Sequence, residues 1–321
     1  MRHLISLGLF IVVVFLAACA VTATSVPAAL PPANTPTPLP SAVPARALTT
    51  VPFDRAKLGT VERDIPDCTV EGMTLTLDVY YPKEMSRPAP VAVYVHGGSW
   101  SSGNKTDAIG MTDVPELLSR GYLVVSVEYR HAPHWKFPAQ IEDVKCAIRF
   151  LRAKAARFNL DPNKIGAWGH SAGGHLVSLL GTTTADAGFE GDGQYQDQSS
   201  RIQAVVDLCG RADLLGMPQD KAANVFGAQD GSVHLLEHAS PITFVSEDDP
   251  PFLILHGGKD NIVPLRASEE FYERLKAAGV PVRLVVVKNA DHGFQPVDGP
   301  MSPTRAELTK MTADFFDQYL K

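Results

Sequence analysis

Hydrophobic positions alternate between strand-like and helix-like segments from about residue 75 onward. Residues 75–79 alternate apolar and polar side chains, which is typical of a half-exposed strand. The later apolar segments are nearly continuous and of strand length, which indicates strands buried on both faces. These continuous segments are residues 91–95, 122–127, 165–168, 204–208, 252–255 and 282–287.

Helical spacing of apolar residues occurs between these strand-like segments. Ile141, Val144 and Ile148 recur every three or four residues and form one apolar stripe along a helix. Residues 271–278 show the same spacing before Gly279, which is a plausible helix stop. The alternation of buried strands with helices predicts an α/β domain, with a mostly parallel central sheet covered by helices on both faces.

The N-terminus differs from the rest of the chain. Met1-Arg2-His3 precede an apolar segment from Leu4 to Ala18, which has signal-peptide length and is short for a membrane span. It closes on Leu16-Ala17-Ala18-Cys19, which resembles a bacterial lipobox, where cleavage would leave Cys19 to carry a lipid. Ordinary cleavage after Ala18-Cys19-Ala20 also satisfies the small-x-small rule. We expect export from the cytoplasm, as a membrane-anchored lipoprotein or otherwise as a secreted protein, with residues 1–19 as signal peptide and lipobox.

Residues 20–52 are rich in Pro, Thr and Ala and nearly free of charge. Such a segment cannot bury enough surface to offset its conformational entropy, so we expect a disordered tether. Residues 53–321 then form a single catalytic domain. The whole chain has 29 basic and 35 acidic residues and a formal charge of -6, which offers no basic patch for nucleic acid.

Three cysteines follow the signal peptide, namely Cys68, Cys146 and Cys209. An odd number permits at most one disulfide, even in an oxidising compartment. Their spacing matches no zinc or redox motif, and we expect no metal site. Cys146 falls inside the predicted amphipathic helix and Cys209 ends an apolar strand, so both are interpreted as buried small hydrophobes. Whether any of the three pair is left open.

A glycine-flanked serine provides the first candidate for chemistry. Ser171, in Gly169-His170-Ser171-Ala172-Gly173, lies between a strand ending near Trp168 and a helix beginning at Ala172. In this context a G-x-S-x-G match places the serine hydroxyl on a sharp turn above the sheet. A serine hydroxyl is a poor nucleophile until a base takes its proton, so a histidine and a carboxylate are required downstream.

Both partners follow the carboxyl ends of predicted strands. Asp260 comes after residues 252–255, and His292 comes after residues 282–287. The order Ser, Asp, His is that of α/β-hydrolases, with the histidine as base and the aspartate orienting it. Asp291 and, more weakly, Asp207 are rivals for the acid. Adjacent side chains rarely face each other, so Asp260 is favoured over Asp291.

Acyl transfer also needs hydrogen-bond donors for the developing oxyanion. A glycine-containing loop after residues 91–95 supplies backbone N–H groups, and we expect those of Gly98 and Ser99 to act together with that of Ala172. Trp100 and Phe294 flank the site and could form an acyl- or alcohol-binding wall. Ordinary packing of these aromatic side chains is an equal alternative.

Five ordered motifs together identify a family resemblance. They are His96-Gly97-Gly98-Ser99-Trp100, Phe137 to Val144, Gly169 to His175, His256 to Asp260, and His292-Gly293-Phe294. With these motifs the chain resembles the esterase/lipase branch of the α/β-hydrolase fold related to hormone-sensitive lipase, especially bacterial feruloyl- and acetyl-esterase-like hydrolases. The resemblance implies ester hydrolysis without a cofactor, with Ser171, Asp260 and His292 as the triad. Ser99 stands where many relatives have a third glycine, but its backbone N–H survives.

The expected function is hydrolysis of a carboxylic ester through an acyl-enzyme intermediate. Short acyl or aryl esters, such as acetyl or feruloyl groups on small molecules or polysaccharide, are the expected substrates. A peptidase or amidase of the same fold is an alternative, because the same triad cleaves amides in related folds. A catalytically silent binding module is a further alternative, which the complete set of catalytic elements disfavours. The sequence leaves the physiological substrate and the oligomeric state open.

Overall fold

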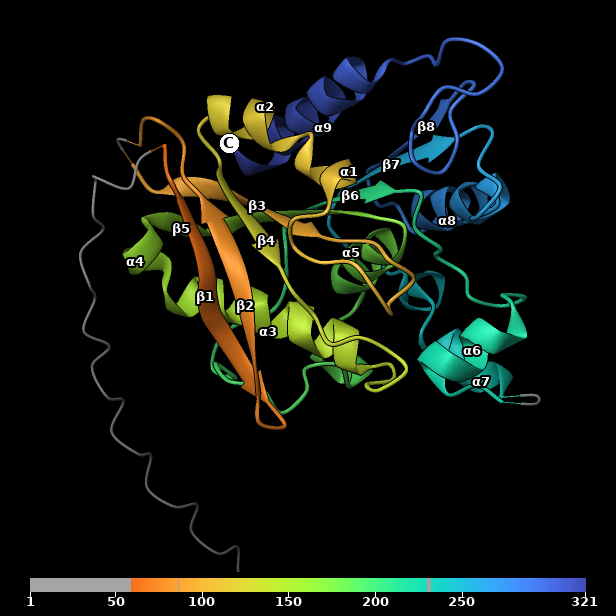
Figure 1. Cartoon of the computed structure of the whole chain (residues 1–321), viewed down its shortest axis with the longest axis horizontal. Coiled ribbons are helices and arrows are strands. Elements are labelled where there is room, and N and C mark those ends of the chain that lie inside the picture. Colours follow the sequence, from red (N-terminus) through yellow and green to blue (C-terminus); the bar gives the residue numbers. More distant parts are fainter. Residues whose placement is uncertain (1–58, 86, 230–231) are drawn as a thin grey trace, which may run out of the picture. The chain divides into compact units, whose positions relative to one another are not determined.

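A computed structural model describes residues 59–85, 87–229 and 232–321 of the chain (Figure 1). The expected signal peptide, Cys19 and the expected tether over residues 20–52 lie outside the described residues. Within the described ranges, no helix combines the length and the apolar character that crossing a membrane requires.

The described residues form an eight-stranded sheet in the order β1-β2-β4-β3-β5-β6-β7-β8. Strands β1, β2 and β4 pair antiparallel, whereas β3 pairs parallel with β4 and β5, and β5 to β8 continue the parallel pairing. The mostly parallel sheet expected from the sequence is therefore confirmed. The strands are β1 (Val61–Val70), β2 (Met73–Tyr80), β3 (Ala89–Val95), β4 (Leu123–Val127), β5 (Leu160–His170), β6 (Ala204–Leu208), β7 (Phe252–Gly257) and β8 (Val282–Val287).

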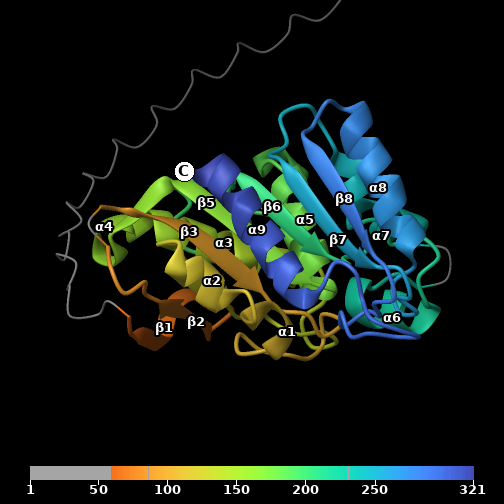
Figure 2. The same ribbon diagram turned by 90° about the horizontal axis from the view of Figure 1, so that it is seen from above.

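Helices cover both faces of the sheet, as the sequence predicted. In Figure 2, α2 and α9 lie over one face, whereas α3 and α5 lie over the other. Helices α6 and α7 lie beside each other, away from the sheet (Figure 1). The helices are α1 (Ala108–Met111), α2 (Val114–Ser119), α3 (Ala139–Ala153), α4 (Ala155–Phe158), α5 (Ala172–Thr182), α6 (Gln219–Phe226), α7 (Val233–His238), α8 (Leu265–Ala277) and α9 (Arg305–Leu320), with 3-10 turns at Ala185–Ala187 and Pro241–Phe244.

Each face of the sheet has its own hydrophobic core. Successive side chains of β3 point to opposite faces, so Val93 enters one core and Tyr94 the other. The first core contains Phe271 of α8, and the second contains Phe316 of α9. Burial on both faces explains why most strands read as continuous apolar segments in the sequence.

Strand β8 departs from this pattern. The sequence predicted a strand buried on both faces, but β8 is only partly buried, and Val286 is 43% exposed. The reason is its position, because β8 pairs only with β7 at the edge of the sheet. An apolar segment alone does not distinguish an edge strand from a central one.

The interpretation of Cys146 as a free buried side chain is wrong. Cys146 on α3 forms a disulfide with Cys68 on β1, with their Cα atoms 6.3 Å apart and 78 positions apart in sequence. The sequence pattern predicted no strand at β1, so nothing placed Cys68 beside α3. Cys209 is free and buried, as expected.

Candidate active site

Ser171 lies in a sharp turn between β5 and α5. Its backbone has φ 58° and ψ -116°, which is an unfavourable conformation for a residue with a side chain. Its N–H donates to the carbonyl of Leu208 at the end of β6, at 2.9 Å. A Cβ on Gly173 would lie 2.0 Å from the carbonyl oxygen of Val95, so only glycine allows α5 to approach β3 this closely. Ser171 therefore has the strand–turn–helix context that the motif predicted.

Asp260 and His292 meet across the ends of β7 and β8. His292 Nδ1 donates to Asp260 Oδ2 at 2.7 Å, and His256 Nε2 lies 3.2 Å from the same oxygen. Asp260 Oδ1 accepts from the backbone N–H groups of Ile262 and Val263, at 2.8 and 2.9 Å. The side chain of Asp260 is fully buried. Its carboxylate is therefore fixed on both oxygens, with one of them facing His292.

The electrostatics of Asp260 follow from these contacts. Burial alone would raise the pKa of the carboxyl, because it disfavours the charged form. The hydrogen bonds from His256 and His292, and from the N–H groups of Val263 and Ile262, outweigh burial and hold the pKa of Asp260 well below its ordinary value. Asp260 is accordingly an anion at neutral pH, able to orient His292 and to stabilise its protonated form.

The loop that carries His292 is tied to the strand that carries Ser171. His170 Nε2 donates to the carbonyl oxygen of His292 at 2.8 Å, and Cys209 Sγ donates to the same oxygen at 3.4 Å. The rings of His170 and His292 have centroids 4.8 Å apart. Burial lowers the pKa of His170 to about 4, so this side chain is neutral at pH 7. Two elements more than 120 residues apart in sequence are thereby joined next to Ser171.

The two rival acids are occupied elsewhere. Asp291 Oδ1 accepts from the N–H groups of Gly293 and Gln295, at 2.9 and 2.8 Å, and so holds its own loop. Asp207 Oδ1 accepts from the N–H of Gly210 at 2.7 Å, and its Oδ2 accepts from Ser178 Oγ at 3.2 Å. Of the three carboxylates considered, the structure brings Asp260 against the ring of His292.

The loop after β3 presents backbone N–H groups beside Ser171. Gly98, Ser99 and Trp100 have φ of 110°, 53° and 59°, and a Cβ on Gly98 would lie 2.0 Å from the carbonyl oxygen of Ser102. Among the described residues, the N–H groups of Gly98 and Ser99 find no hydrogen-bond acceptor. Ala172 is the first residue of α5, where a helix leaves its N–H groups unpaired.

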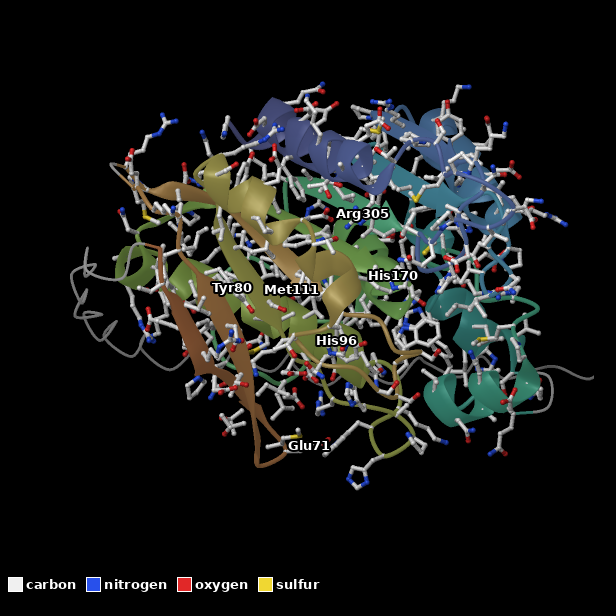
Figure 3. The ribbon with its side chains drawn as sticks, turned by 45° about the horizontal axis from the view of Figure 1, so that its top comes forward. Glu71, Tyr80, His96, Met111, His170 and Arg305 are labelled. Carbon is white, nitrogen blue, oxygen red and sulfur yellow. A yellow bond between two sulfur atoms is a disulfide. The ribbon has the colours of Figure 1, made fainter. Side chains whose placement is uncertain are left out.

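His96 braces this loop from behind. Its ring stacks on Tyr129 with centroids 4.1 Å apart, and Tyr129 Oη donates to the carbonyl oxygens of His96 and Gly97, at 3.0 and 3.2 Å. His96 and His170 directly follow Val95 and Gly169, which are paired across β3 and β5, and the two histidines mark this end of the sheet in Figure 3. The loop after β3 and the turn at Ser171 are therefore neighbours.

A small cavity of about 60 Å³ opens beside Ser171. Trp100 lines it but is anchored, because its indole N–H donates to His175 Nδ1 at 3.1 Å. For Phe294 the structure agrees with the packing alternative and not with the wall. It is 2% exposed, packs edge-on against His170 and is not part of the cavity wall. The lining residues are Ser99, Trp100, Ser171, Ala172, Arg211, Met217, Pro218, Lys221, Ile262 and Val263.

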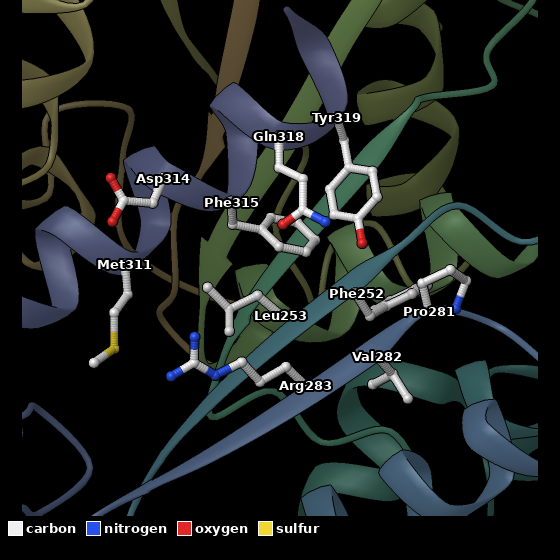
Figure 4. Close-up of a pocket in the computed structure, with 10 residues that line it drawn as sticks. All are labelled: Phe252, Leu253, Pro281, Val282, Arg283, Met311, Asp314, Phe315, Gln318 and Tyr319. Carbon is white, nitrogen blue, oxygen red and sulfur yellow. The ribbon is translucent and has the colours of Figure 1, made fainter.

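A larger cavity, of about 340 Å³, lies far from this chemistry (Figure 4). Phe252 and Val282, the first residues of β7 and β8, line it together with Phe315 and Tyr319 of α9. It therefore lies at the opposite ends of the strands from Asp260 and His292. It contains no serine or histidine, and its size alone does not make it a candidate for hydrolysis.

Four polar residues near Ser171 received no role from the sequence. His256 lay inside a recognised motif, four positions before Asp260, and that spacing was the available signal. His170 lay inside the serine motif. Arg211 and Lys221 carried no motif, because they belong to the stretch between β6 and β7, which shows no recognisable pattern in the sequence.

Known proteins resemble this chain over most of the described domain. The family model BD-FAE matches residues 77–275. Esterase LipC of Mycobacterium tuberculosis is 35% identical over 234 residues, which are 70% of this chain and 58% of that protein. A truncated carbohydrate esterase from gut microbiota has a TM-score of 0.71 and 30% identity, covering 84% of this chain and 99% of that one.

A third similar protein is Thermogutta terrifontis esterase 2 with propionate bound, with a TM-score of 0.66 and 26% identity over 81% of this chain and 94% of that one. The chain spans about half the length of LipC, LipM and LipQ of M. tuberculosis, from 51% to 58%. The structural neighbours confirm the α/β-hydrolase fold. On the match to residues 77–275, the chain belongs to the BD-FAE family.

Proposed function

We propose that the chain is a carboxylic ester hydrolase whose triad is Ser171, His292 and Asp260. His292 removes the proton from the Ser171 hydroxyl as its oxygen attacks the ester carbonyl. The alcohol then leaves with that proton, and an acyl group remains on Ser171. His292 next deprotonates a water molecule as its oxygen attacks the acyl carbon. The bond from that carbon to Ser171 then breaks, the acid leaves, and the proton returns to the Ser171 hydroxyl. Asp260 holds the histidine in the required tautomer throughout.

The observation that carries this proposal is the bond from His292 Nδ1 to Asp260 Oδ2, at 2.7 Å. It leaves Nε2 as the nitrogen that can accept a proton, on a loop tied to His170 beside Ser171. The unpaired N–H groups of Gly98 and Ser99, with that of Ala172, are the proposed oxyanion donors. All of these groups lie at one end of the parallel strands, where sites in such sheets form.

The substrate is proposed to be an ester with a short acyl group or an aryl acid, such as an acetyl or feruloyl ester. A cavity of about 60 Å³ is small beside the several hundred Å³ of pockets that hold larger ligands, which favours a small group next to Ser171. The gut carbohydrate esterase supports a substrate linked to carbohydrate, and the T. terrifontis esterase with bound propionate supports a short acyl group.

The decisive experiment measures hydrolysis by the purified chain and its Ser171→Ala variant. Substrates are nitrophenyl esters of increasing acyl length, acetylated xylan, feruloyl esters and peptide amides. We expect ester turnover that is fastest on short or aryl esters and that falls by about 10⁵- to 10⁶-fold without the Ser171 hydroxyl. Ser119→Ala, in a serine at the end of α2, is the matched control and should leave the rate unchanged. Ester turnover that survives Ser171→Ala contradicts the mechanism, and turnover of amides alone would identify a peptidase or amidase.

We propose further that the enzyme is exported and held at a bacterial membrane by a lipid on Cys19. The Cys68–Cys146 disulfide supports export, because disulfides persist in oxidising compartments. Partitioning of the full chain into membranes, compared with its Cys19→Ser variant, tests the anchor. Loss of partitioning is the expected result, and unchanged partitioning would reject lipidation.

A further inference from the structure

Two cationic side chains line the cavity beside Ser171. Arg211 follows the end of β6, and Lys221 lies in the first turn of α6. Lys221 Nζ donates to Ser99 Oγ at 3.4 Å, which places the ammonium group next to the proposed oxyanion loop. Arg211 donates only to backbone carbonyl oxygens, from Nε to Asp213 at 3.1 Å and from Nη2 to Leu215 at 3.5 Å.

Neither cation has a carboxylate partner in the part of the chain that the structure describes. No Asp or Glu oxygen of the described residues lies within 4.0 Å of the charged nitrogens of Arg211 or Lys221. Some other buried cations do have one, such as Arg130 with Asp143 at 2.9 Å and Lys145 with Glu190 at 2.9 Å, whereas Arg152 donates to backbone carbonyl oxygens alone. Asp213, the carboxylate nearest to Arg211 in sequence, instead accepts from the N–H of Leu215 at 2.8 Å.

An unpaired cation at a partly buried position is costly, because burial removes water from the charge without supplying a counterion. Burial lowers the pKa of Arg211, and the charge of Asp213 offsets this only in part. The overall charge of the chain does not account for the two cations, since its 35 acidic residues exceed its 29 basic ones. The positive charge is local to the cavity. An anion bound there would serve as the counterion for both side chains.

We propose that Arg211 and Lys221 select esters that carry a carboxylate close to the ester bond. This inference rests on the proposed ester hydrolysis and adds the charge of the substrate to it. The carboxylate can belong to the acyl part or to the alcohol part, and either source presents the same chemistry to the two cations. A guanidinium and an ammonium group that line the same small cavity as Ser171 suit a carboxylate bound beside the serine.

A merely structural role for Lys221 makes a different prediction. If the side chain only holds Ser99 in place, its loss will slow every ester by the same factor. If it binds a carboxylate, its loss will slow anionic esters more than neutral ones. The ratio of kcat/KM for an anionic ester to that for its neutral counterpart, here called the charge ratio, separates the two roles.

The experiment uses two pairs of esters that differ in charge. For the alcohol side the pair is 4-acetoxybenzoate and methyl 4-acetoxybenzoate, and for the acyl side it is mono-4-nitrophenyl glutarate and 4-nitrophenyl pentanoate. The charge ratio is measured for the unmodified protein and for Arg211→Gln and Lys221→Met. Lys276→Met is the matched control, because Lys276 is 60% exposed on α8 and lies away from the cavity. Comparison of each variant with the unmodified protein cancels the intrinsic reactivities of the esters.

We expect the charge ratio of at least one pair to fall about tenfold in each cavity variant and to stay unchanged in Lys276→Met. The pair that responds identifies the side of the ester that bears the carboxylate. Raising the NaCl concentration should also lower the charge ratio of the unmodified protein, since salt screens the attraction. A charge ratio within twofold of the unmodified protein for both pairs in both variants would overturn this inference alone. Failure of the unmodified protein to hydrolyse any of the four esters would overturn the proposed function as well.

Discussion

Two buried carboxylates in this chain, Asp260 and Asp67, differ in the hydrogen bonds that they receive. Asp260 follows β7, and its carboxylate receives hydrogen bonds on both oxygens. Asp67 lies on β1 beside the Cys68–Cys146 disulfide, and neither of its oxygens has a side-chain partner among the described residues. We call these two regions the β7 loop and the β1–α3 seam.

Burial acts in the same direction on both carboxyl groups, but the net shifts of their pKa values are opposite. Burial raises the pKa of Asp67 to about 7, since little opposes the cost of removing a charge from water. At Asp260 the burial cost is outweighed by the donors around it, and the pKa lies well below its ordinary value. Burial alone therefore does not mark a catalytic carboxylate. The donors that hold it as an anion, and the histidine on one of its oxygens, are the distinguishing features.

The largest expected effect tests the β7 loop. Asp260→Asn should lower kcat by about 10⁴-fold, because an amide no longer fixes the required tautomer of His292. The measurement is steady-state hydrolysis of a short nitrophenyl ester. Asp67→Asn is the matched control from the β1–α3 seam, and it should leave kcat unchanged. Equal losses in the two variants would remove the functional distinction between the regions.

The next effect tests the disulfide of the β1–α3 seam. Replacing both Cys68 and Cys146 with serine should lower the free energy of unfolding by about 4 kcal/mol, because the bond closes a loop of 78 positions in the unfolded chain. Urea denaturation measures the change, and kcat at 25 °C should remain that of the unmodified protein. A reducing agent should destabilise the unmodified protein and leave the double variant unaffected. A loss of activity without a loss of stability would show that the seam acts on the active site.

An effect of similar size concerns the pH dependence of stability. The pKa of Asp67 is about 7 in the folded protein and about 3.9 when unfolded, so the folded state holds its proton more tightly. The stability contributed by the protonated form is complete below about pH 4 and is lost as the pH rises through 7. Asp67→Asn should therefore raise the free energy of unfolding at pH 8 by roughly 4 kcal/mol and give little gain at pH 4. Urea denaturation at both pH values provides the test, and a gain of equal size at both would contradict this account.

The smallest effect sharpens the comparison within the catalytic end of the sheet. Asp291 adjoins His292 but accepts from the N–H groups of Gly293 and Gln295. Asp291→Ala should lower the free energy of unfolding by about 1 kcal/mol and kcat by less than tenfold, because it removes a loop contact. Asp291→Asn keeps an acceptor oxygen and should restore most of the loss. A fall in kcat comparable with that of Asp260→Asn would reassign the triad acid.

Local patterns in the sequence were sufficient for strands β2 to β8 and for the choice of the candidate triad. Continuous apolar segments predicted β3 to β8, because strands buried on both faces admit few polar residues. The motif around Ser171 predicted a turn between strand and helix, since only that context gives G-x-S-x-G its meaning. Strand β1, with its many polar residues in VERDIPDCTV, gave no such signal.

The sequence by itself determined which residues could perform the chemistry and the order in which they occur, because strand periodicity and short motifs depend on neighbours along the chain. Only the tertiary structure decided how distant segments meet. It paired Cys68 with Cys146, placed Asp260 rather than Asp291 against His292, buried Phe294 away from the cavity and brought Arg211 and Lys221 to its wall. These contacts join residues on separate strands and loops, whose relative positions are set by packing across the whole sheet and not by local sequence.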